Sequence, residues 1–263
     1  MSLITHIGRA TMRVVVPLLF IASCTVAPAP HTPPASAATV LPTAPATAQL
    51  KPVPLPKVGY STKSTDILRC QHKTDEVILS YDDGISGQQK LDSLLRTLDK
   101  NNIRAYFFFT GEFAGAHPKM MRQIAAAGHV LGNHSYNHPL LTRLSDTAIK
   151  SQIRRGVQGN TTRKLLRPPY GGGAFTARLQ KIAKNMGYAV CYWTVDTRDW
   201  DAKASPSART IVNRVIKGDK YSPPVKKGGV ILMHGTSRFG VEATPEIIRH
   251  IKKLGLKFPK LRA

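Results

Sequence analysis

The sequence predicts a parallel α/β fold whose strands close into a barrel, in a single domain over residues 59–263. Short apolar runs alternate with amphipathic segments from about residue 74 onward. The runs are continuously apolar rather than alternating, as expected for parallel strands that are buried on both faces. Ionisable residues follow several of these runs. Such alternation of strands and helices is typical of the α/β class.

Residues 1–23 have the features of a lipoprotein signal peptide. Arg9 and Arg13 precede an apolar run over residues 14–22, which is too short to span a bilayer as a helix. The run ends in Ile-Ala-Ser-Cys, which resembles the bacterial lipobox. This resemblance implies cleavage before Cys24 and attachment of a lipid to its thiol. An ordinary signal peptide that ends in a cysteine is the alternative.

Residues 24–58 are rich in Pro, Ala and Thr, and we interpret them as a tether between the lipid and the domain. Such a stretch has too little apolar surface to fold. We therefore expect an exported protein anchored to the bacterial cell envelope. Thr25 follows Cys24 where an aspartate would favour retention in the inner membrane. The outer membrane is the preferred location if the host is Gram-negative.

The charge balance is strongly basic, with 38 Lys and Arg against 15 Asp and Glu and a formal net charge of +23. Few basic residues precede Asp66, so most of this charge belongs to the domain. A cationic surface favours an anionic partner such as a wall polymer, and general solubility explains it equally well. Nucleic acid is not expected as a partner, because no recognised binding motif is present. We expect a monomer.

Two cysteines remain in the domain, Cys70 and Cys191. Export to an oxidising compartment permits a disulfide between them. Cys191 lies within an apolar run, however, where a free buried thiol behaves as a small hydrophobe, and this favours two unpaired thiols. The sequence leaves both outcomes open.

Buried strands are predicted at residues 77–79, 105–109, 130–131, 165–166, 189–193 and 230–233. The helix after the first strand has an apolar stripe of four leucines, Leu91, Leu94, Leu95 and Leu98. Later helices are expected to begin at Ser145, at Ser205-Pro206 and at Thr244-Pro245. Gly218 and Gly255 are expected to follow helix ends, and Trp193 is expected in the core.

Ionisable residues follow the ends of five different predicted strands, namely Asp82-Asp83, His134, Arg167, Asp196 and His234. In a barrel, the C-terminal ends of the strands converge on one face, where catalytic groups gather. A doubly wound open sheet is the alternative, but it would bring five such groups to one rim less readily. The distribution of these residues favours the barrel.

Two pairs of residues suggest a metal site. His134 and His138 are spaced to share one face of a helical turn that Pro139 ends, so both imidazoles could reach one ion. Two histidines and one carboxylate leave positions open, as catalytic zinc or cobalt requires. Of Asp82 and Asp83, one could bind the metal while the other takes a proton from water. Taken singly, surface histidines and an Asp-Asp-Gly turn are the better interpretations.

Five segments together resemble the motifs of the polysaccharide deacetylase family, which is the NodB-homology group or carbohydrate esterase family four. They are SYDDG at 80–84, HSYNH at 134–138, RPPYG at 167–171, DTRDW at 196–200 and ILMHG at 231–235. The resemblance covers residues 74–263. It implies a distorted (β/α) barrel of the NodB-homology type.

The resemblance also implies a ligand set and a base. Asp83, His134 and His138 would bind a divalent metal, usually Zn²⁺, with Co²⁺ or another divalent ion as alternatives. Asp82 would take the proton from the attacking water. Arg167 would hold Asp82 and lower its proton affinity.

The remaining implied roles concern the leaving group and the substrate groove. The backbone N–H of Tyr170 would stabilise the oxyanion. His234 would protonate the departing amine, oriented by Asp199. Trp200 and Leu232 would form walls for the acetyl methyl group.

The first motif, which continues as SYDDGI over residues 80–85, departs from the common family pattern TFDDGP. Tyr81 replaces a phenylalanine and Ile85 replaces a proline. The loss of the proline affects the loop beside the base, and therefore substrate fit more than chemistry. Gly235 stands where the family often has an aspartate.

Together these features predict a lipid-anchored, metal-dependent hydrolase that removes N-acetyl groups from an aminosugar polymer, with peptidoglycan preferred over chitin-like or exopolysaccharide substrates. An O-acetyl ester deacetylase on the same scaffold is one alternative. A catalytically inactive wall-binding lipoprotein is another.

Overall fold

The computed structural model describes residues 61–72, 74–162 and 164–261. The predicted signal peptide, the tether and the lipidation site Cys24 lie outside the described residues. No helix in the described ranges is long and apolar enough to cross a membrane.

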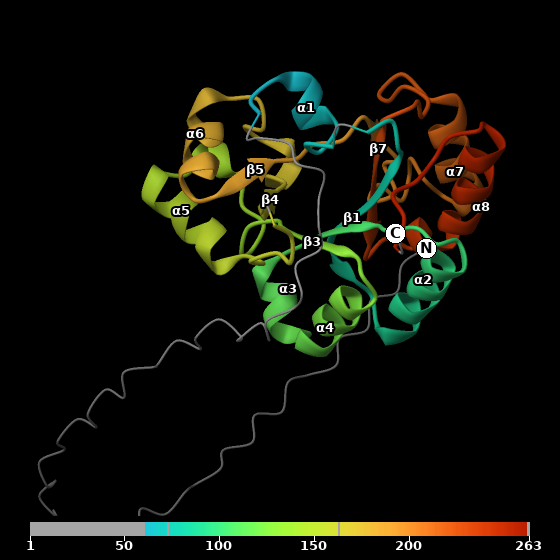
Figure 1. Ribbon diagram of the computed structural model, residues 1–263, viewed down its shortest axis with the longest axis horizontal. Coiled ribbons are helices and arrows are strands. Elements are labelled where there is room, and N and C mark those ends of the chain that lie inside the picture. Colours follow the sequence, from blue (N-terminus) through green and yellow to red (C-terminus); the bar gives the residue numbers. More distant parts are fainter. Residues whose placement is uncertain (1–60, 73, 163, 262–263) are drawn as a thin grey trace, which may run out of the picture. The chain divides into compact units, whose positions relative to one another are not determined.

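Seven parallel strands form one sheet in the order β5-β4-β3-β2-β1-β7-β6 (Figure 1). Their bounds are β1 Ile78–Ile85, β2 Tyr106–Phe109, β3 Val130–Asn133, β4 Lys164–Leu166, β5 Tyr188–Val190, β6 Val195–Asp196 and β7 Val230–Gly235. All registers are parallel. The six predicted strands are present, and the short β6 is an addition.

The sheet curls because its two edge strands are consecutive in the chain. Only residues 191–194 connect β5 to β6, and this connection can span at most about 18 Å. The two edges must therefore lie close together although the other five strands separate them in the sheet order. This arrangement confirms the predicted distorted (β/α) barrel.

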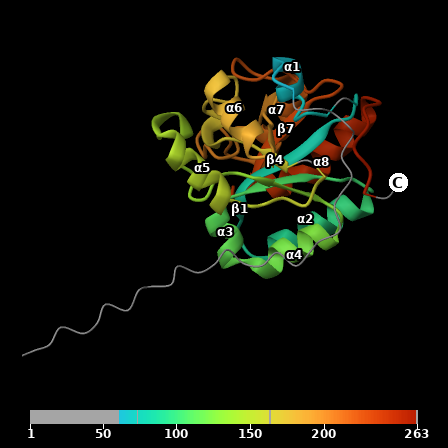
Figure 2. The ribbon, with the colours of Figure 1, turned by 60° about the vertical axis from the view of Figure 1, so that its left-hand side comes forward.

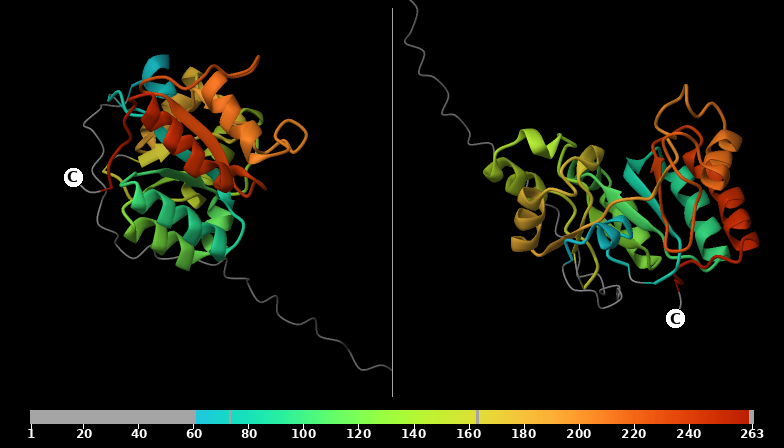
Figure 3. Two further views of the ribbon diagram at one scale, coloured as in Figure 1. Left: turned by 90° about the vertical axis from the view of Figure 1, so that its right-hand side faces the viewer. Right: turned by 90° about the horizontal axis from the view of Figure 1, so that it is seen from above.

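Helices pack against the sheet along its length (Figures 1 and 2). The α-helices are α1 Ser64–Leu68, α2 Gln88–Lys100, α3 Gly111–Ala116, α4 Pro118–Ala126, α5 Asp146–Arg155, α6 Ala177–Asn185, α7 Ala208–Lys217 and α8 Gly240–Lys253. Two short 3-10 helices, η1 Leu141–Arg143 and η2 Pro169–Gly171, lie in the connections. The leucine stripe of α2 is buried as predicted, and α7 packs beside α8 (Figure 3).

The predicted helix starts are correct at one position and wrong at two. Ser145 caps α5 by accepting the N–H of Ala148. Ser205 instead points inward and donates to the carbonyl of Arg198, while Ser207 caps α7. Helix α8 begins at Gly240, one turn before the predicted start, so Pro245 lies inside it. The predicted glycines, Gly218 and Gly255, do follow helix ends with positive φ.

Cys70 and Cys191 form a disulfide. The prediction of two unpaired thiols is therefore wrong, although Cys191 is fully buried as its apolar surroundings suggest. The bond joins the turn after α1 to the segment after β5, which are far apart in sequence. Cys70 and Gln71 adopt left-handed φ values of 54° and 59° where the chain turns toward this contact.

Candidate active site

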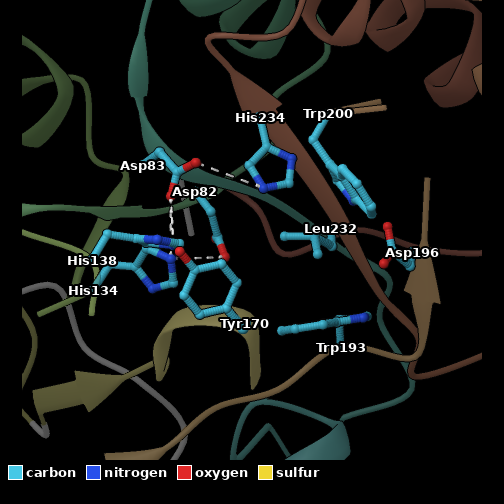
Figure 4. Close-up of a pocket in the computed structure, with 10 residues that line it drawn as sticks. All are labelled: Asp82, Asp83, His134, His138, Tyr170, Trp193, Asp196, Trp200, Leu232 and His234. Carbon is cyan, nitrogen blue, oxygen red and sulfur yellow. Dashed lines mark ion pairs between the residues drawn. The ribbon is translucent and has the colours of Figure 1, made fainter. Parts of the chain in front are cut away.

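The predicted site residues gather at the C-terminal end of the sheet (Figure 4). Asp82 and Asp83 lie within β1, and His234 lies within β7. Asp82 stands directly opposite His234 in the ladder between these strands. His134 is the first residue after β3, and Arg167 is the first after β4. Parallel pairing therefore delivers five polar side chains from four strands to one rim.

Asp82 and Asp83 both face the pocket, although neighbours in a regular strand point to opposite faces. Asp83 has a left-handed φ of 67°. The register between β1 and β7 also shifts between Asp82 and Ile85. Such irregularities re-aim side chains and are common beside active sites. Here the irregularity directs two adjacent carboxylates into one cavity.

Asp83, His134 and His138 form a cluster with the composition of a metal site. The Nε2 atoms of His134 and His138 each lie 3.3 Å from Asp83 Oδ1. One ligand atom of each residue lies within 4.8 Å of the others. The histidines do not share a helical turn, however, because Ser135 and His138 have left-handed φ values of 64° and 63°. The predicted helical turn is wrong, and the predicted imidazole pair is present.

Side-chain hydrogen bonds shape this loop where helical bonds were expected. Asn133 Oδ1 accepts the N–H of Ser135 at 2.8 Å, and Ser135 Oγ accepts the N–H of His138 at 3.1 Å. His134 Nδ1 lies 2.7 Å from the carbonyl oxygen of Arg167. Since a carbonyl only accepts, Nδ1 must carry the proton, and the Nε2 of a neutral His134 is free to act as a ligand.

The cluster fits a divalent cation. Asp83 Oδ1 is buried and has no hydrogen-bond partner among the described residues. Burial acts to raise the pKa of Asp83, but its interactions with His134, His234 and His138 outweigh burial and lower the pKa to about 2. Burial, followed by the charge of His134, lowers the pKa of His138. An ionised carboxylate beside imidazole nitrogens is the form in which these groups bind metal.

Arg167 holds the second carboxylate in place. Its Nη1 donates to Asp82 Oδ1 at 2.7 Å and to Ser80 Oγ at 2.8 Å. Arg167 and Asp82 are both buried, and the guanidinium lies 4.1 Å from the ring centre of Phe108. The other carboxylate oxygen, Asp82 Oδ2, lies 3.7 Å from His134 Nε2. Asp82 is thus fixed with one oxygen on the arginine and the other beside the metal-ligand cluster.

His234 is oriented by Asp199 on the other wall of the pocket. Its Nδ1 lies 2.8 Å from Asp199 Oδ1, and its backbone N–H donates to Asp199 Oδ2 at 2.7 Å. Burial acts to lower the pKa of His234, but the hydrogen bond and charge of Asp199, with the charges of Asp82 and Asp83, raise it to about 9. The imidazole is therefore protonated at neutral pH. A side chain on Gly240 would collide with Asp199, so this pair requires the glycine.

These groups open into a pocket of about 370 Å³ (Figure 4). Tyr170, Trp200 and Leu232 line it, as the family resemblance implied. Tyr170 and Trp200 are 67% and 58% exposed, so aromatic surface borders the mouth. Arg167 and Asp199 do not line the pocket themselves, but they contact its lining residues Asp82 and His234. The structure thus brings together every site residue predicted within the domain.

Two lining residues were not predicted to belong to the site. Trp193 was expected in the core and does pack against a buried cluster, but β5 ends at Val190 and Trp193 also borders the pocket. Asp196 was expected at the rim without a role. Burial raises its pKa, and its Oδ1 accepts the N–H of Arg198 at 2.8 Å. Asp196 is the first residue of the motif at 196–200 and Trp193 lies three residues before it, which is the signal in the sequence that could have identified them.

A family model for polysaccharide deacetylase matches residues 70–191. A peptidoglycan-N-acetylglucosamine deacetylase of Bacillus cereus is 33% identical over 195 residues, which cover 71% of this chain and 66% of that protein. The chain therefore spans just under two thirds of the length of this relative.

Solved structures share the fold. A family 4 carbohydrate esterase from Streptomyces lividans, in complex with acetate, is 34% identical with a TM-score of 0.60 over 70% of this chain and 91% of that one. A CE4 family pseudoenzyme from Bacillus anthracis is 28% identical with a TM-score of 0.60 over 71% of this chain and 63% of that one. The similarity therefore includes both a carbohydrate esterase and a protein described as a pseudoenzyme.

Proposed function

Because the chain belongs to the polysaccharide deacetylase family, we propose that it is a metal-dependent deacetylase that hydrolyses N-acetyl groups of peptidoglycan. One observation carries the proposal: a metal-ligand cluster, a buried carboxylate and a protonated imidazole converge on one pocket. Amide hydrolysis needs an activated water, a site for the developing negative charge and an acid for the departing amine. The pocket offers a candidate for each.

Asp83, His134 and His138 would hold the ion. Zinc is the preferred candidate, because two histidines and one carboxylate suit it and leave positions open, and cobalt accepts the same ligands. When bound, the ion supplies Lewis acidity, which polarises an acetyl carbonyl and acidifies water. The carbonyl oxygen of Arg167 would keep His134 in the tautomer that presents Nε2.

Asp82 would act as the base. Its Oδ1 is occupied by Arg167, while Oδ2 lies beside the ligand cluster and can accept a proton from the attacking water. The positive charge of Arg167 compensates the charge of this buried carboxylate. The fixed guanidinium also restricts the carboxylate to one orientation, which favours proton transfer in a defined direction.

His234 would act as the acid. Its Nδ1 is directed to Asp199, so Nε2 faces the pocket and can protonate the departing amine nitrogen. The backbone N–H of Tyr170 would donate to the developing oxyanion. Trp200 and Leu232 would enclose the acetyl methyl group, since both line the same cavity.

We propose further that the enzyme is exported and carried on a lipid at Cys24, with residues 24–58 as the tether. The support is the sequence of the first 58 residues together with the basic domain, which suits an anionic wall. An inactive wall-binding role is disfavoured, because the carboxylate pair, both histidines, Arg167 and His234 are all present and arranged for reaction.

A hydrolase of O-acetyl esters is the second candidate, because one solved relative is described as a carbohydrate esterase. Acetate release from peptidoglycan, an N-acetylglucosamine oligomer and O-acetylated xylan separates the candidates. The proposal expects acetate from the first two at rates well above the third. Acetate from xylan alone would assign the esterase function, and acetate from none would contradict both.

A further inference from the structure

We propose that the disulfide between Cys70 and Cys191 positions Arg167, and through it Asp82, for the reaction. The proposal rests on the deacetylase function above, since it assigns a role in placing the base of that reaction. Neither cysteine lines the pocket. Their effect would pass entirely through the guanidinium group.

The two Nη atoms of Arg167 face different parts of the fold. Nη1 donates to Ser80 Oγ and Asp82 Oδ1, which both belong to β1. Nη2 donates to Cys191 Sγ at 3.3 Å and to the carbonyl oxygen of Tyr192 at 3.1 Å. Arg167 therefore bridges the strand that carries the base and the segment that carries the disulfide.

The segment over residues 191–194 crosses between the two edges of the sheet and is not itself a strand. The N-terminal part of the domain holds it in place. Tyr192 donates its N–H to the carbonyl of Ile67 at 2.9 Å, and Gln71 Nε2 donates to the carbonyl of Val190 at 2.8 Å. The disulfide adds the covalent tie at the residue that contacts Arg167.

Arg167 depends on this segment because it is fully buried and stays charged. Its Nε has no partner among the described residues, so Nη2 supplies the remaining hydrogen bonds away from β1. If the segment shifts, both Nη2 bonds weaken and the guanidinium can tilt away from Asp82. A displacement of about 1 Å at a catalytic group can reduce turnover on the order of 100-fold.

The test replaces both cysteines by alanine (Cys70→Ala with Cys191→Ala) in the full-length protein. We expect kcat on an N-acetylglucosamine oligomer to fall about 10- to 100-fold, with KM and zinc affinity unchanged. Gln71→Ala is the matched control, because it removes a neighbouring tie to Val190 of β5 but leaves the disulfide, the bond from Tyr192 to Ile67 and every contact of Arg167 in place. Its kcat should stay within about twofold of wild type, measured well below the Tm of each variant.

A second readout is independent of turnover. With ¹⁵N-labelled arginine, the buried guanidinium of Arg167 should give slowly exchanging N–H signals that persist in Gln71→Ala and broaden or vanish in the double alanine variant. Unchanged signals and unchanged kcat in a folded double variant would overturn the proposal. So would an equal loss in Gln71→Ala, which would indicate general loosening. A wild-type protein that releases no acetate would contradict the proposed function, while the N–H signals would still decide the role of the disulfide.

Discussion

Two buried carboxylate–cation pairs lie at the pocket, and they differ in which partner is proposed to react. Asp82 lies 2.7 Å from Arg167, and Asp199 lies 2.8 Å from His234. In the first pair the carboxylate is the proposed reacting group and the cation supports it. In the second pair the cation is the proposed reacting group and the carboxylate supports it. The distances are nearly equal, so the choice of cation makes the difference.

Arginine keeps its charge under all ordinary conditions, whereas histidine can release its proton. The Asp82–Arg167 pair is therefore permanent, and removal of either partner leaves a buried charge without compensation. In the Asp199–His234 pair, the histidine can lose its proton and become neutral. We expect changes to the first pair to cost both activity and stability, and changes to the second to cost activity in a pH-dependent way.

The largest effect is expected for Asp82→Asn. An asparagine can still accept a hydrogen bond from Arg167 but cannot take a proton from water, so acetate release should fall about 10³-fold or more. Zinc binding should persist, because Asp83, His134 and His138 are untouched. Steady-state kinetics with zinc titration by calorimetry would check this, and wild-type rates in the variant would contradict the proposed base.

Arg167→Met should lower stability as well as activity. It removes the charge that compensates Asp82 in a site where both side chains are buried. Loss of one partner of a buried pair costs about 3–5 kcal/mol. Chemical denaturation would measure this loss, and a variant as stable as wild type would contradict the claim that Arg167 compensates the buried charge of Asp82.

Asp199→Asn should change how both activity and thermal stability depend on pH. The pKa of His234 is raised to about 9 in the metal-free protein, so its protonation stabilises the fold fully below about pH 6.5 and is lost as pH rises through about 9. The variant removes the charge that raises this pKa. The alkaline limit of activity should therefore move to lower pH, and the decrease in Tm between pH 6.5 and 9 should become smaller.

Wild type and variant should be compared over the same pH range by kinetics and by thermal unfolding of metal-free protein. Superimposable pH profiles would contradict the role of Asp199. A stability loss at pH 6 as large as that of Arg167→Met would remove the contrast between the two pairs.

The smallest effect is expected for Arg178→Ala, which breaks an ion pair on the surface. Arg178 lies 2.7 Å from Asp146, but the two side chains are 46% and 58% exposed. Such pairs contribute about 0–1 kcal/mol. The free energy of unfolding should change by no more than about 1 kcal/mol, and the rate of acetate release should match wild type within about twofold. These values give a baseline for the buried pairs.

The parts of the fold that repeat a simple pattern were predictable from the sequence. Continuous apolar runs predicted the six longer strands, and the leucine stripe predicted the buried face of α2. The site residues followed from motif resemblance and from their places near strand ends. Ser145 was predictable as a cap because its hydroxyl bonds to a residue only three positions away.

Features that depend on contacts distant in sequence were not predictable. The disulfide joins cysteines 121 residues apart. The loop from His134 to His138 is shaped by Asn133, whose amide is itself held by the carbonyls of Ile153 and Val157. Spacing alone suggested a helical turn, because the i, i+4 pattern carries no information about these partners.

In the proposed reaction, a metal held by Asp83, His134 and His138 acts together with Asp82 to release acetate. The most direct test measures acetate from an N-acetylglucosamine oligomer before chelation, after chelation and after zinc is restored, with Asp82→Asn treated in parallel. We predict that wild type loses its activity and regains it, whereas the variant binds zinc and remains inactive. Undiminished acetate release by metal-free wild type, or full activity of the zinc-loaded variant, would contradict the claim.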